Sequence, residues 1–407
     1  MNCNPRIVIA LGGNALQSKD SDSTAEAQLE VVRRTCERIA DISCAGYEMA
    51  VVHGNGPQVG RIVLASETAK DVVPPMPFDV CGAMSQGYIG YHIQQCLHYA
   101  LAKRNRNVPV VTLATQMVVE QSDPAFQNPT KPIGAFYSQE EARRLEQEKG
   151  YAIREDAGRG WRRVVASPLP RRIVEISAVQ KLWEDTIVIT CGGGGIPVVE
   201  HPDGSLSGVA AVIDKDFAAE LLAEQVHADV LMILTEVERV AIRWGKPDQK
   251  DLNHLTLAEA ARYVDEGHFG VGSMLPKVQA AMQFVRAHPD RKAIITSLDK
   301  ALDALEGMTE LETVCLAGCG LWSIQPLSSG KKLRNVYLGR NNVSDLSPLI
   351  GCDIAEMYLD LNKLNGNSEA FRGLTVHGFI VMNGNGYAQE DLEYIRSTIN
   401  GEADLEI

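Results

Sequence analysis

Residues 186–200, TIVITCGGGGIPVVE, place four consecutive glycines after an apolar, β-branched run and close them with a proline and a second β-branched run. Short apolar runs bounded by glycine are typical of buried strands. Glycine after a strand permits a tight turn and a close approach of another group to the backbone. The stretch therefore predicts a buried strand that ends in a loop against which something packs closely.

The same pattern continues outward over about the first three hundred residues. Apolar strand-like runs alternate with amphipathic helical segments, which favours an α/β fold with a mostly parallel sheet covered on both faces. The segment 118–170 interrupts the rhythm with Asp, Pro, Gly and Arg, and we expect it to form a small inserted lid subdomain. The expected strands are 6–13, 47–56, 108–115, 186–195, 229–235 and 292–297, and the expected helices are 25–42, 214–227, 256–264 and 276–287.

Composition narrows the class of protein. The chain has 407 residues, which suggests two units, and its formal charge of −13 argues against nucleic-acid binding. We expect no membrane span, because no apolar run is long enough. The N-terminal segment lacks the features of a secretory signal, and the nine cysteines lack disulfide-rich spacing. These features predict a cytoplasmic protein with reduced thiols, and the pair Cys315 and Cys319 indicates packing rather than a zinc site.

A repeat begins near residue 311, so we expect a domain at 1–310 and another at 311–407. Apolar residues recur at offsets 0, 3, 5 and 10, and a turn position recurs at offset 8. This pattern resembles the leucine-rich repeat and implies a short α/β solenoid that binds a partner or leans on its neighbour. An irregular α/β extension with chance leucine spacing is the alternative. The copies start at Leu311, Leu333, Ile354 and Val376, and offset 8 holds Cys319, Asn341, Asn362 and Gly384; the fourth copy continues with Phe379, Val381 and Gly386.

Three expected strands end in glycine loops. In an open parallel sheet, ligands bind beyond the carboxyl ends of the strands, where backbone N–H groups attract anions. Each loop alone is more often just a tight turn, but together the loops favour binding of an extended phosphate ligand. Neither the P-loop nor the G-x-G-x-x-G fingerprint is present. The loop residues are Gly12, Gly13 and Asn14; Gly54, Asn55 and Gly56; and Gly192–Gly195, including Gly193 and Gly194.

Lysines near expected helix starts support the same interpretation. Lys215 follows the candidate N-cap Asp214, and Lys277 follows the candidate N-cap Ser273 and Pro276. A cation in a first helical turn is disfavoured by the helix dipole, so an anion between the lysines and the helix ends would explain both. Exposed lysines that tolerate a small cost are the alternative. Lys131, between prolines in the insert, is suited to reach over a bound phosphate, and Asp216 could orient lysines, hold a metal or simply favour the helix start.

Eight motifs, taken in order, resemble the carbamate kinases of the amino acid kinase superfamily over residues 5–307. The resemblance implies a three-layer α/β/α fold, usually a homodimer, that interconverts ATP plus carbamate with ADP plus carbamoyl phosphate. It also implies Mg²⁺ held through the nucleotide phosphates rather than by protein ligands, and a direction usually toward ATP in arginine or purine breakdown. The motifs are IALGGNAL, VVHGNGPQVG, SQGYIGY, DPAFQNPTKPIGAFY, EDAGRGWRRVVASPLP, TCGGGGIPVV, VIDKDFAAELLAE and GHFGVGSMLPKVQAA.

The resemblance also implies roles for particular residues. Lys131 and Lys215 would flank the transferring phosphoryl group, Lys277 would hold nucleotide phosphates, and Asp216 would orient lysines. The loops at Gly12 and Gly54 would bind carbamate and the phosphoryl group, and the Gly192–Gly195 loop, with Gly193 and Gly194 as phosphate-binding residues, would lie near the nucleotide phosphates. Residues near the adenine would include Val240, Trp244 and Met274, and Arg159, Arg162 and Arg163 would either gate the site or form a solvated basic face.

Two further functions stay open at this point. The kinase fold could serve as a catalytically weak scaffold or sensor whose repeats bind a protein partner. A superfamily kinase for an amino-acid carboxylate such as glutamate fits the general fold but not the lid motif PTKPIG at 129–134.

Overall fold

The computed structural model describes residues 5–16, 24–156, 158–288, 290–305, 313–318, 321–324, 327 and 332–406. The chain divides into two compact units, Met1–Leu302 and Asp303–Ile407. The domain boundary expected at residue 310 lies outside the described residues. Within the described part of the chain, no helix is long and apolar enough to cross a membrane.

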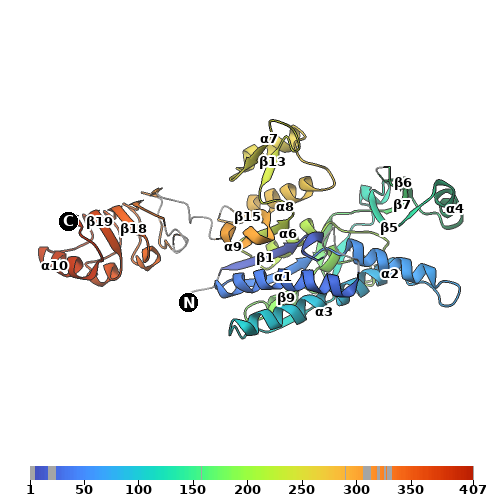
Figure 1. The fold of residues 1–407 in the computed structure, drawn as a ribbon, viewed down its shortest axis with the longest axis horizontal. Helices are drawn as coiled ribbons and strands as arrows, with labels where there is room; N and C mark the ends of the chain where they lie inside the picture. The colour runs from blue at the N-terminus through green and yellow to red at the C-terminus, as the bar shows by residue number, and fades with distance from the viewer. Residues whose placement is uncertain are drawn as a thin grey trace. The chain divides into compact units, whose positions relative to one another are not determined.

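A six-stranded parallel sheet forms the centre of the first unit, in the order β15-β12-β1-β2-β9-β3 (Figure 1). The expected mostly parallel sheet is confirmed. Its strands are almost wholly apolar because both faces are covered, as parallel sheets require. The bounds are β1 Arg6–Leu11, β2 Glu48–His53, β3 Val110–Thr112, β9 Ile187–Ile189, β12 Val230–Thr235 and β15 Lys292–Ser297.

Helices α5 (Ile176–Leu182), α6 (Lys215–Gln225) and α8 (Met274–Ala287) pack on one face of this sheet. Ala218, Leu222 and Phe284 are fully buried there among alternate strand residues. Alternation along the strands directs the remaining apolar side chains to the opposite face.

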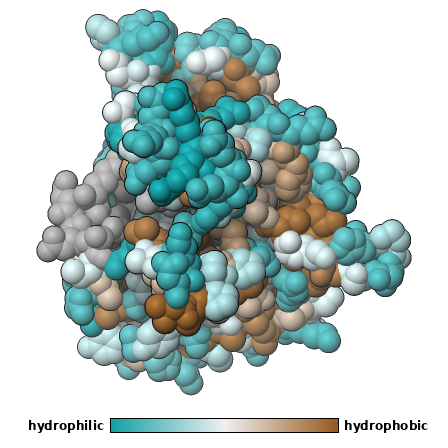
Figure 2. Space-filling model, turned by 90° about the vertical axis from the view of Figure 1, so that its right-hand side faces the viewer, coloured by the Kyte–Doolittle hydropathy of each residue, from teal (hydrophilic) through white to brown (hydrophobic). Residues whose placement is uncertain are grey.

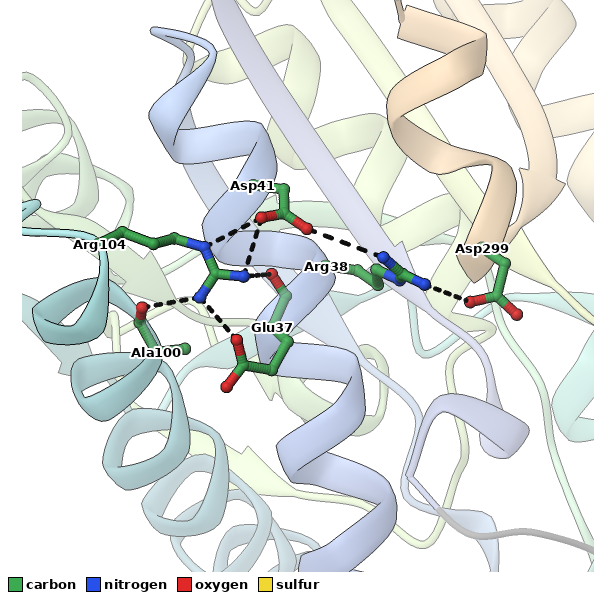
Figure 3. A network of polar contacts seen from close by, with 6 residues as sticks. All are labelled: Glu37, Arg38, Asp41, Ala100, Arg104 and Asp299. Carbon is green, nitrogen blue, oxygen red and sulfur yellow. Dashed lines mark hydrogen bonds and ion pairs between the residues drawn. The ribbon is translucent and has the colours of Figure 1, made fainter.

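Helices α1 (Ala25–Cys44) and α3 (Phe78–Lys103) run side by side and are joined by Arg104. Arg104 donates from Nη1 to Glu37 Oε2 at 2.6 Å and from Nε to Asp41 Oδ1 at 2.9 Å (Figure 3). Its bonds to Glu37 and Asp41 fix the end of α3 against α1. The sequence reasoning did not predict α2 (Gly56–Thr68) or α3, whose glycines at positions 82, 87 and 90 obscure the helical pattern.

The first unit also contains a second sheet and a projecting lobe, both separate from the central sheet. The second sheet has the order β11-β10-β4-β8, and the lobe, here called the lid, consists of a three-stranded sheet β5-β7-β6 and helix α4. Seen from the lid end, the surface is largely hydrophilic with scattered apolar patches (Figure 2). The bounds are β4 Gln116–Val119, β8 Pro170–Ile173, β10 Ile196–Glu200, β11 Leu206–Gly208, β5 Lys131–Tyr137, β6 Ile153–Glu155, β7 Trp161–Val165 and α4 Gln139–Lys149.

A small apolar cluster joins a two-stranded sheet to helices at another edge of the first unit. It includes Val240, Phe269 and Val278. The sheet pairs β13 (Val240–Ile242) with β14 (Lys250–Leu252), and α7 (Leu257–Asp265) packs beside α8.

The second unit is a five-stranded parallel sheet in the order β16-β17-β18-β19-β20. Thr313 pairs with Asn335 on the next strand, and Asn335 pairs with Glu356 on the one after. Equivalent positions therefore recur 22 and then 21 residues apart. Apolar side chains between the sheet and the returning loops form one core. The bounds are β16 Thr313–Cys315, β17 Asn335–Tyr337, β18 Asp353–Tyr358, β19 Thr375–Val381, β20 Asp404–Glu406 and α10 Gln389–Thr398.

Buried asparagines link successive turns of this unit. Asn362 accepts from Val343 N at 3.0 Å and donates to the carbonyls of Leu338 and Leu359 at 2.9 Å. Asn341 and Asn385 bond in the same way to their own neighbouring turns. Side-chain amides thus satisfy backbone groups that no strand pairs.

The assignment of the fourth copy was wrong. Asn385 occupies the ladder position expected for Gly384, and the buried strand residues are Ile380 and Met382 rather than Phe379 and Val381. A β-bulge causes the shift, because β19 inserts one extra residue between the pairs Ile354–Val376 and Glu356–Phe379. A Cβ at Gly378 would lie 2.1 Å from the Ala355 carbonyl oxygen, which explains the glycine there. Cys319, expected in the first copy, lies outside the described residues.

Candidate active site

Two loops at the carboxyl ends of β1 and β2 begin the candidate site. Gly12 follows β1 and caps the short helix η1 (Gly13–Ala15), which contains Asn14. A Cβ at Gly12 would lie 2.9 Å from the Leu234 carbonyl oxygen, so β12 restricts this position to glycine. After β2, Gly54 faces the Lys215 side chain at 3.6 Å, measured from an ideal Cβ, and Gly56 begins α2. The structure thus brings the Gly54 loop next to the first turn of α6.

Protein atoms approach the four-glycine run from several sides. A Cβ at Gly192 would lie 2.4 Å from His53 Nε2, and a Cβ at Gly193 would lie 2.2 Å from Asn55 Nδ2. Gly193 and Gly194 also have positive φ, 67° and 93°, which disfavours other residues. The glycines are therefore required by close packing within the protein, and phosphate binding at Gly193 and Gly194 stays a prediction.

A buried polar network holds these loops together. Gln86 of α3 donates to the carbonyls of Gly192 at 2.9 Å and Thr115 at 3.1 Å, and accepts from Thr115 N at 2.8 Å. Asn55 donates to Ser85 Oγ at 2.8 Å. Burial lowers the pKa of His53 to about 4, so the ring is neutral near pH 7. The network fixes the Asn55 loop against the glycine run without adding charge.

Asp216 pairs with two lysines at the centre of the site. Its carboxylate Oδ1 bonds Lys215 Nζ, and its Oδ2 accepts from Lys277 Nζ at 2.9 Å. The side chains of Lys215 and Lys277 are 13% and 15% exposed, which contradicts the alternative of exposed, tolerated lysines. The Asp216 carboxylate offsets both positive charges at helix starts where the dipole opposes them.

The helix starts differ in their capping. Asp214 caps α6, since its Oδ1 accepts from Asp216 N at 3.0 Å, as expected from the sequence. Ser273 occupies the N-cap position of α8, but its side chain makes no capping bond. Instead, Lys277 Nζ donates to the Ser273 carbonyl at 3.2 Å. Lys277 is thereby held at the beginning of its own helix.

The lid contributes the third lysine. Lys131, the first residue of β5, donates from Nζ to Asp214 Oδ2 at 3.0 Å. The base of β5 also lies on α2, where an ideal Cβ at Gly60 would be 3.8 Å from Gly134 N. Asp214 therefore connects the lid to the helix that carries Lys215 and Asp216.

Electrostatics in this cluster depend on burial and on neighbouring charges. Burial lowers the pKa of Lys215, and Lys277 lowers it further, while Asp216 acts in the opposite direction. Burial alone would raise the pKa of Asp214, but Lys131, the hydrogen bond from Asp216 N and Lys215 lower it. The site therefore concentrates positive charge that two carboxylates only partly balance, as an anion-binding site requires.

The model of the amino acid kinase family matches residues 5–297. The chain belongs to the amino acid kinase family.

Several relatives of this amino acid kinase are carbamate kinases. The carbamate kinase of Clostridium perfringens is 54% identical over 306 residues, covering 74% of this chain and 97% of the relative. That of Thermococcus kodakarensis is 53% identical over 76% of this chain and 99% of the relative. The solved carbamate kinase of Giardia lamblia bound to AMP-PNP is 44% identical, with a TM-score of 0.72, over 75% of this chain and 97% of that chain. These matches leave about a quarter of the chain uncovered.

Two of the three residues expected near adenine lie in one apolar cluster of this amino acid kinase. Val240 is buried and Met274 partly buried in the small cluster of β13, β14, α7 and α8, whereas the Trp244 side chain is exposed. Adenine binding by these three residues stays a prediction.

The expected lid arginines contact residues of the lid itself. Arg159 and Arg162 pair with Asp156 at 2.8 and 3.2 Å, and their guanidinium groups lie over the Phe136 ring. Arg163 stacks on Tyr151 at 3.7 Å. These contacts stabilise the lid; a gating role for the arginines stays a prediction.

Sequence reasoning missed three polar contributors to the site. Ser85 and Gln86 lie in the quoted motif SQGYIGY but were given no role, and Asp214 was recognised only as an N-cap. A signal for Asp214 was available, because an acidic cap flanks Lys215 and could also meet a lysine from the insert. For Ser85 and Gln86 no local pattern reveals the contact, since their partners are 30 and 106 residues distant in the chain.

Proposed function

We propose that this amino acid kinase is a carbamate kinase, which interconverts ATP plus carbamate with ADP plus carbamoyl phosphate. The observation that carries the proposal is the cluster in which Asp216 holds Lys215 and Lys277 beside the Gly54 loop while Asp214 holds Lys131. The relatives named carbamate kinase match about three quarters of this chain and almost all of their own length. Phosphoryl transfer needs mainly positioning and charge neutralisation, which lysines and backbone N–H groups supply.

Each lysine has a distinct task in this mechanism. Lys215, fixed by Asp216, and Lys131, delivered by the lid, flank the moving phosphoryl group and neutralise its charge. Lys277 binds the phosphates of the nucleotide, and Asp216 keeps Lys215 and Lys277 apart and oriented. The loops at Gly12–Asn14 and Gly54–Gly56 supply backbone N–H groups to carbamate and the phosphoryl group. These roles fit the observed burial, because buried cations act more strongly on a bound anion than exposed ones.

Magnesium fits this site as an ion held by the phosphates of the nucleotide. Both Asp216 oxygens and Asp214 Oδ2 are engaged by lysines, which leaves the nucleotide phosphates as the main source of oxygen ligands. Among the described residues there is no cluster of three metal-ligating side chains. When bound, Mg²⁺ supplies further neutralisation of phosphate charge.

A second copy of the chain fits the surface around α3 and β3. The strand β3 is an edge of the central sheet, and Tyr91 and Tyr99 of α3 are 59% and 66% exposed. A groove of about 570 Å³ between α3 and β3 is lined by residues that include Tyr91, His98 and Thr112. Covering this partly apolar face supports a homodimer. Among the described residues, no disulfide is formed by Cys36, Cys44, Cys81, Cys96, Cys191 or Cys315, which supports a cytoplasmic location.

The second unit is best interpreted as a leucine-rich-repeat-type solenoid that binds a protein. Its parallel strands, its repeat of 21–22 residues over the first three copies and its asparagine ladder support this interpretation. The intact lysine cluster argues against the alternative of a kinase fold kept only as a scaffold.

The proposal is tested by ATP formation from ADP and fresh carbamoyl phosphate with Mg²⁺. The full chain should be active, and Lys215→Ala should lose most of kcat without loss of folding, whereas Lys149→Ala on the lid should stay close to the parent. Acetyl phosphate and glutamyl substrates serve as competitors, because a kinase for another carboxylate would prefer them. A folded full chain that forms no ATP from carbamoyl phosphate would exclude the proposed activity.

A further inference from the structure

The outward side of the second sheet carries ten residues that we call the outer face. Strand pairing aligns them in two rows that cross all five strands. Their neighbours in the strands, such as Val336, Met357 and Ile380, point into the core. The first row is Thr313, Asn335, Glu356, Phe379 and Asp404, and the second is Cys315, Tyr337, Tyr358, Val381 and Glu406.

Three aromatic rings form a continuous row on this face. Tyr337 and Tyr358 stack with ring centroids 5.0 Å apart, and Phe379 meets Tyr358 edge-on at 5.9 Å. Phe379 is 38% exposed although it is a large apolar side chain. A row of this kind offers flat apolar area at low entropic cost to a partner, since each ring has only two side-chain torsions.

Carboxylates accompany the rings. The outer face holds Glu356, Asp404 and Glu406, and none of its ten described positions is lysine or arginine. Tyr337 Oη donates to Glu356 Oε2 at 2.7 Å, which fixes that carboxylate at the edge of the aromatic row. Residues 303–407 as a whole carry fifteen acidic and seven basic residues. An anionic partner is repelled by this surface, and a cationic one is attracted.

We propose that the outer face binds an arginine-bearing segment of another protein. This inference rests on the proposal that the second unit binds a protein and is independent of the kinase activity. Guanidinium groups suit the surface because they stack on aromatic rings and donate to carboxylates in a planar, bidentate geometry, whereas lysine does neither as well. Arginines of the partner would stack on Tyr337 and Tyr358 while pairing with Glu356 and Glu406.

Binding is measured with the full chain and a fluorescein-labelled peptide of about twelve residues that contains four arginines separated by leucine and glycine. Matched peptides carry lysine or glutamate at the same four positions. At low salt the arginine peptide should bind several-fold more tightly than the lysine peptide, and the glutamate peptide should not bind. Equal binding of the arginine and lysine peptides would contradict the proposed stacking.

Two variants remove the proposed contacts. The double variant Glu356→Gln with Glu406→Gln should raise the dissociation constant of the arginine peptide about tenfold, which is about 1.4 kcal/mol. Tyr358→Ser, tested separately, should have an effect of the same size. The matched control Glu393→Gln with Glu402→Gln makes the same charge change at exposed positions off this face. An equal loss in the control would mean nonspecific attraction to an acidic protein. If Tyr358→Ser disturbs folding, the double variant Glu356→Gln with Glu406→Gln still tests the proposal, because it changes no core residue.

The position of binding is read from cysteine labelling. Cys315 is an exposed member of the outer face, and Cys44 is an exposed cysteine of the first unit. The arginine peptide should slow maleimide labelling of Cys315 and leave Cys44 unchanged, as followed by mass spectrometry. Protection of neither would place the peptide elsewhere and overturn the proposal. Concentration-dependent self-association that Tyr358→Ser abolishes would identify a second copy as the occupant instead; ATP formation in the same samples reports separately on the kinase.

Discussion

Lys131 Nζ and Asp214 Oδ2 lie 3.0 Å apart, so one ion pair joins the lid to the N-cap of the helix that carries Lys215. The other oxygen of Asp214 accepts from Asp216 N. A single carboxylate therefore serves both as the cap of α6 and as the attachment point of the lid lysine.

We expect Asp214→Asn to separate these two tasks. Asparagine caps helices well, so thermal stability should stay nearly unchanged. The charge that positions Lys131 is lost, and kcat/KM should fall about ten- to hundredfold, in line with the worth of a charged hydrogen bond. Steady-state kinetics and thermal unfolding measure the two effects. Asp156→Asn, which removes a lid carboxylate paired with Arg159 and Arg162, is the control; equal kinetics for Asp214→Asn and the parent would exclude the positioning role.

Asp216→Asn should shift the pH dependence of activity. The negative charge of Asp216 raises the pKa of Lys215 against burial and Lys277, so its removal lets that pKa fall further. Lys215 must be protonated to neutralise phosphate, and the alkaline limb of the kcat profile should move to lower pH. The profile is measured for the variant and for Asp265→Asn at the exposed end of α7. An unmoved alkaline limb would show that Lys215 protonation does not control turnover.

Gly192→Ala should damage the first unit through packing rather than through ligand binding. The new Cβ would lie 2.4 Å from His53 Nε2, inside a network that cannot move far because Gln86 bonds the same loop. Overpacking of this kind costs about 1–3 kcal/mol or more. We expect a lower unfolding temperature even without substrates. Gly82→Ala in α3, where an added Cβ meets nothing within 4 Å, should be neutral or slightly stabilising.

Asn362→Ala should destabilise the second unit selectively. Val343 N loses its buried partner, which costs about 1–3 kcal/mol, and the carbonyls of Leu338 and Leu359 each lose one of two bonds but keep those from Asn341 and Asn385. In chemical denaturation the second unit should unfold at a lower denaturant concentration than in the parent. ATP formation at low denaturant should stay at the parental rate. The half-buried Asn383→Ala provides the comparison. A parallel loss of kinase activity would mean that the two units do not unfold separately.

Glu220→Gln should alter stability in a pH-dependent way. Burial raises the pKa of Glu220 from 4.5 to about 8, with a further contribution from Glu224. The folded protein then binds a proton that the unfolded chain has lost, so stability falls as pH rises from about 4.5 to about 8. Glutamine imitates the protonated form. The free energy of unfolding of the variant, relative to that of the parent, should therefore rise by up to about 1.4 kcal/mol per pH unit in that window. Urea unfolding at several pH values measures this, and exposed Glu184→Gln should show no such trend.

The alternation of the chain was sufficient to predict the central sheet. β1 and β12 contain uninterrupted apolar runs, residues 7–11 and 230–234, because these strands are covered on both sides. Helix α3 was missed because its many small and apolar residues hide the helical period. The lysines were found from their conflict with the helix dipole, which is local in sequence. The sequence left three roles open for their shared partner Asp216. Its contact with Lys277 could not be predicted, because the two residues are 61 positions apart in the chain.

The repeat illustrates the limit of counting. Spacing predicted the strands of the first three copies, whereas the bulge in β19 shifted the fourth by one residue. A bulge changes no composition, so only the pairing reveals it. Gly378, which the bulge requires, was a usable signal that was not used.

The last strand, β20, has consequences for how the second unit could have been lengthened. It forms one edge of the sheet, and two of its three residues are Asp404 and Glu406. Charge on an edge strand discourages pairing with another chain. A further repeat added beyond β20 would have to pair with this charged edge, whereas one duplicated between β17 and β18 would meet asparagine ladders on both sides. Growth of the array by internal duplication is therefore easier than growth at its end.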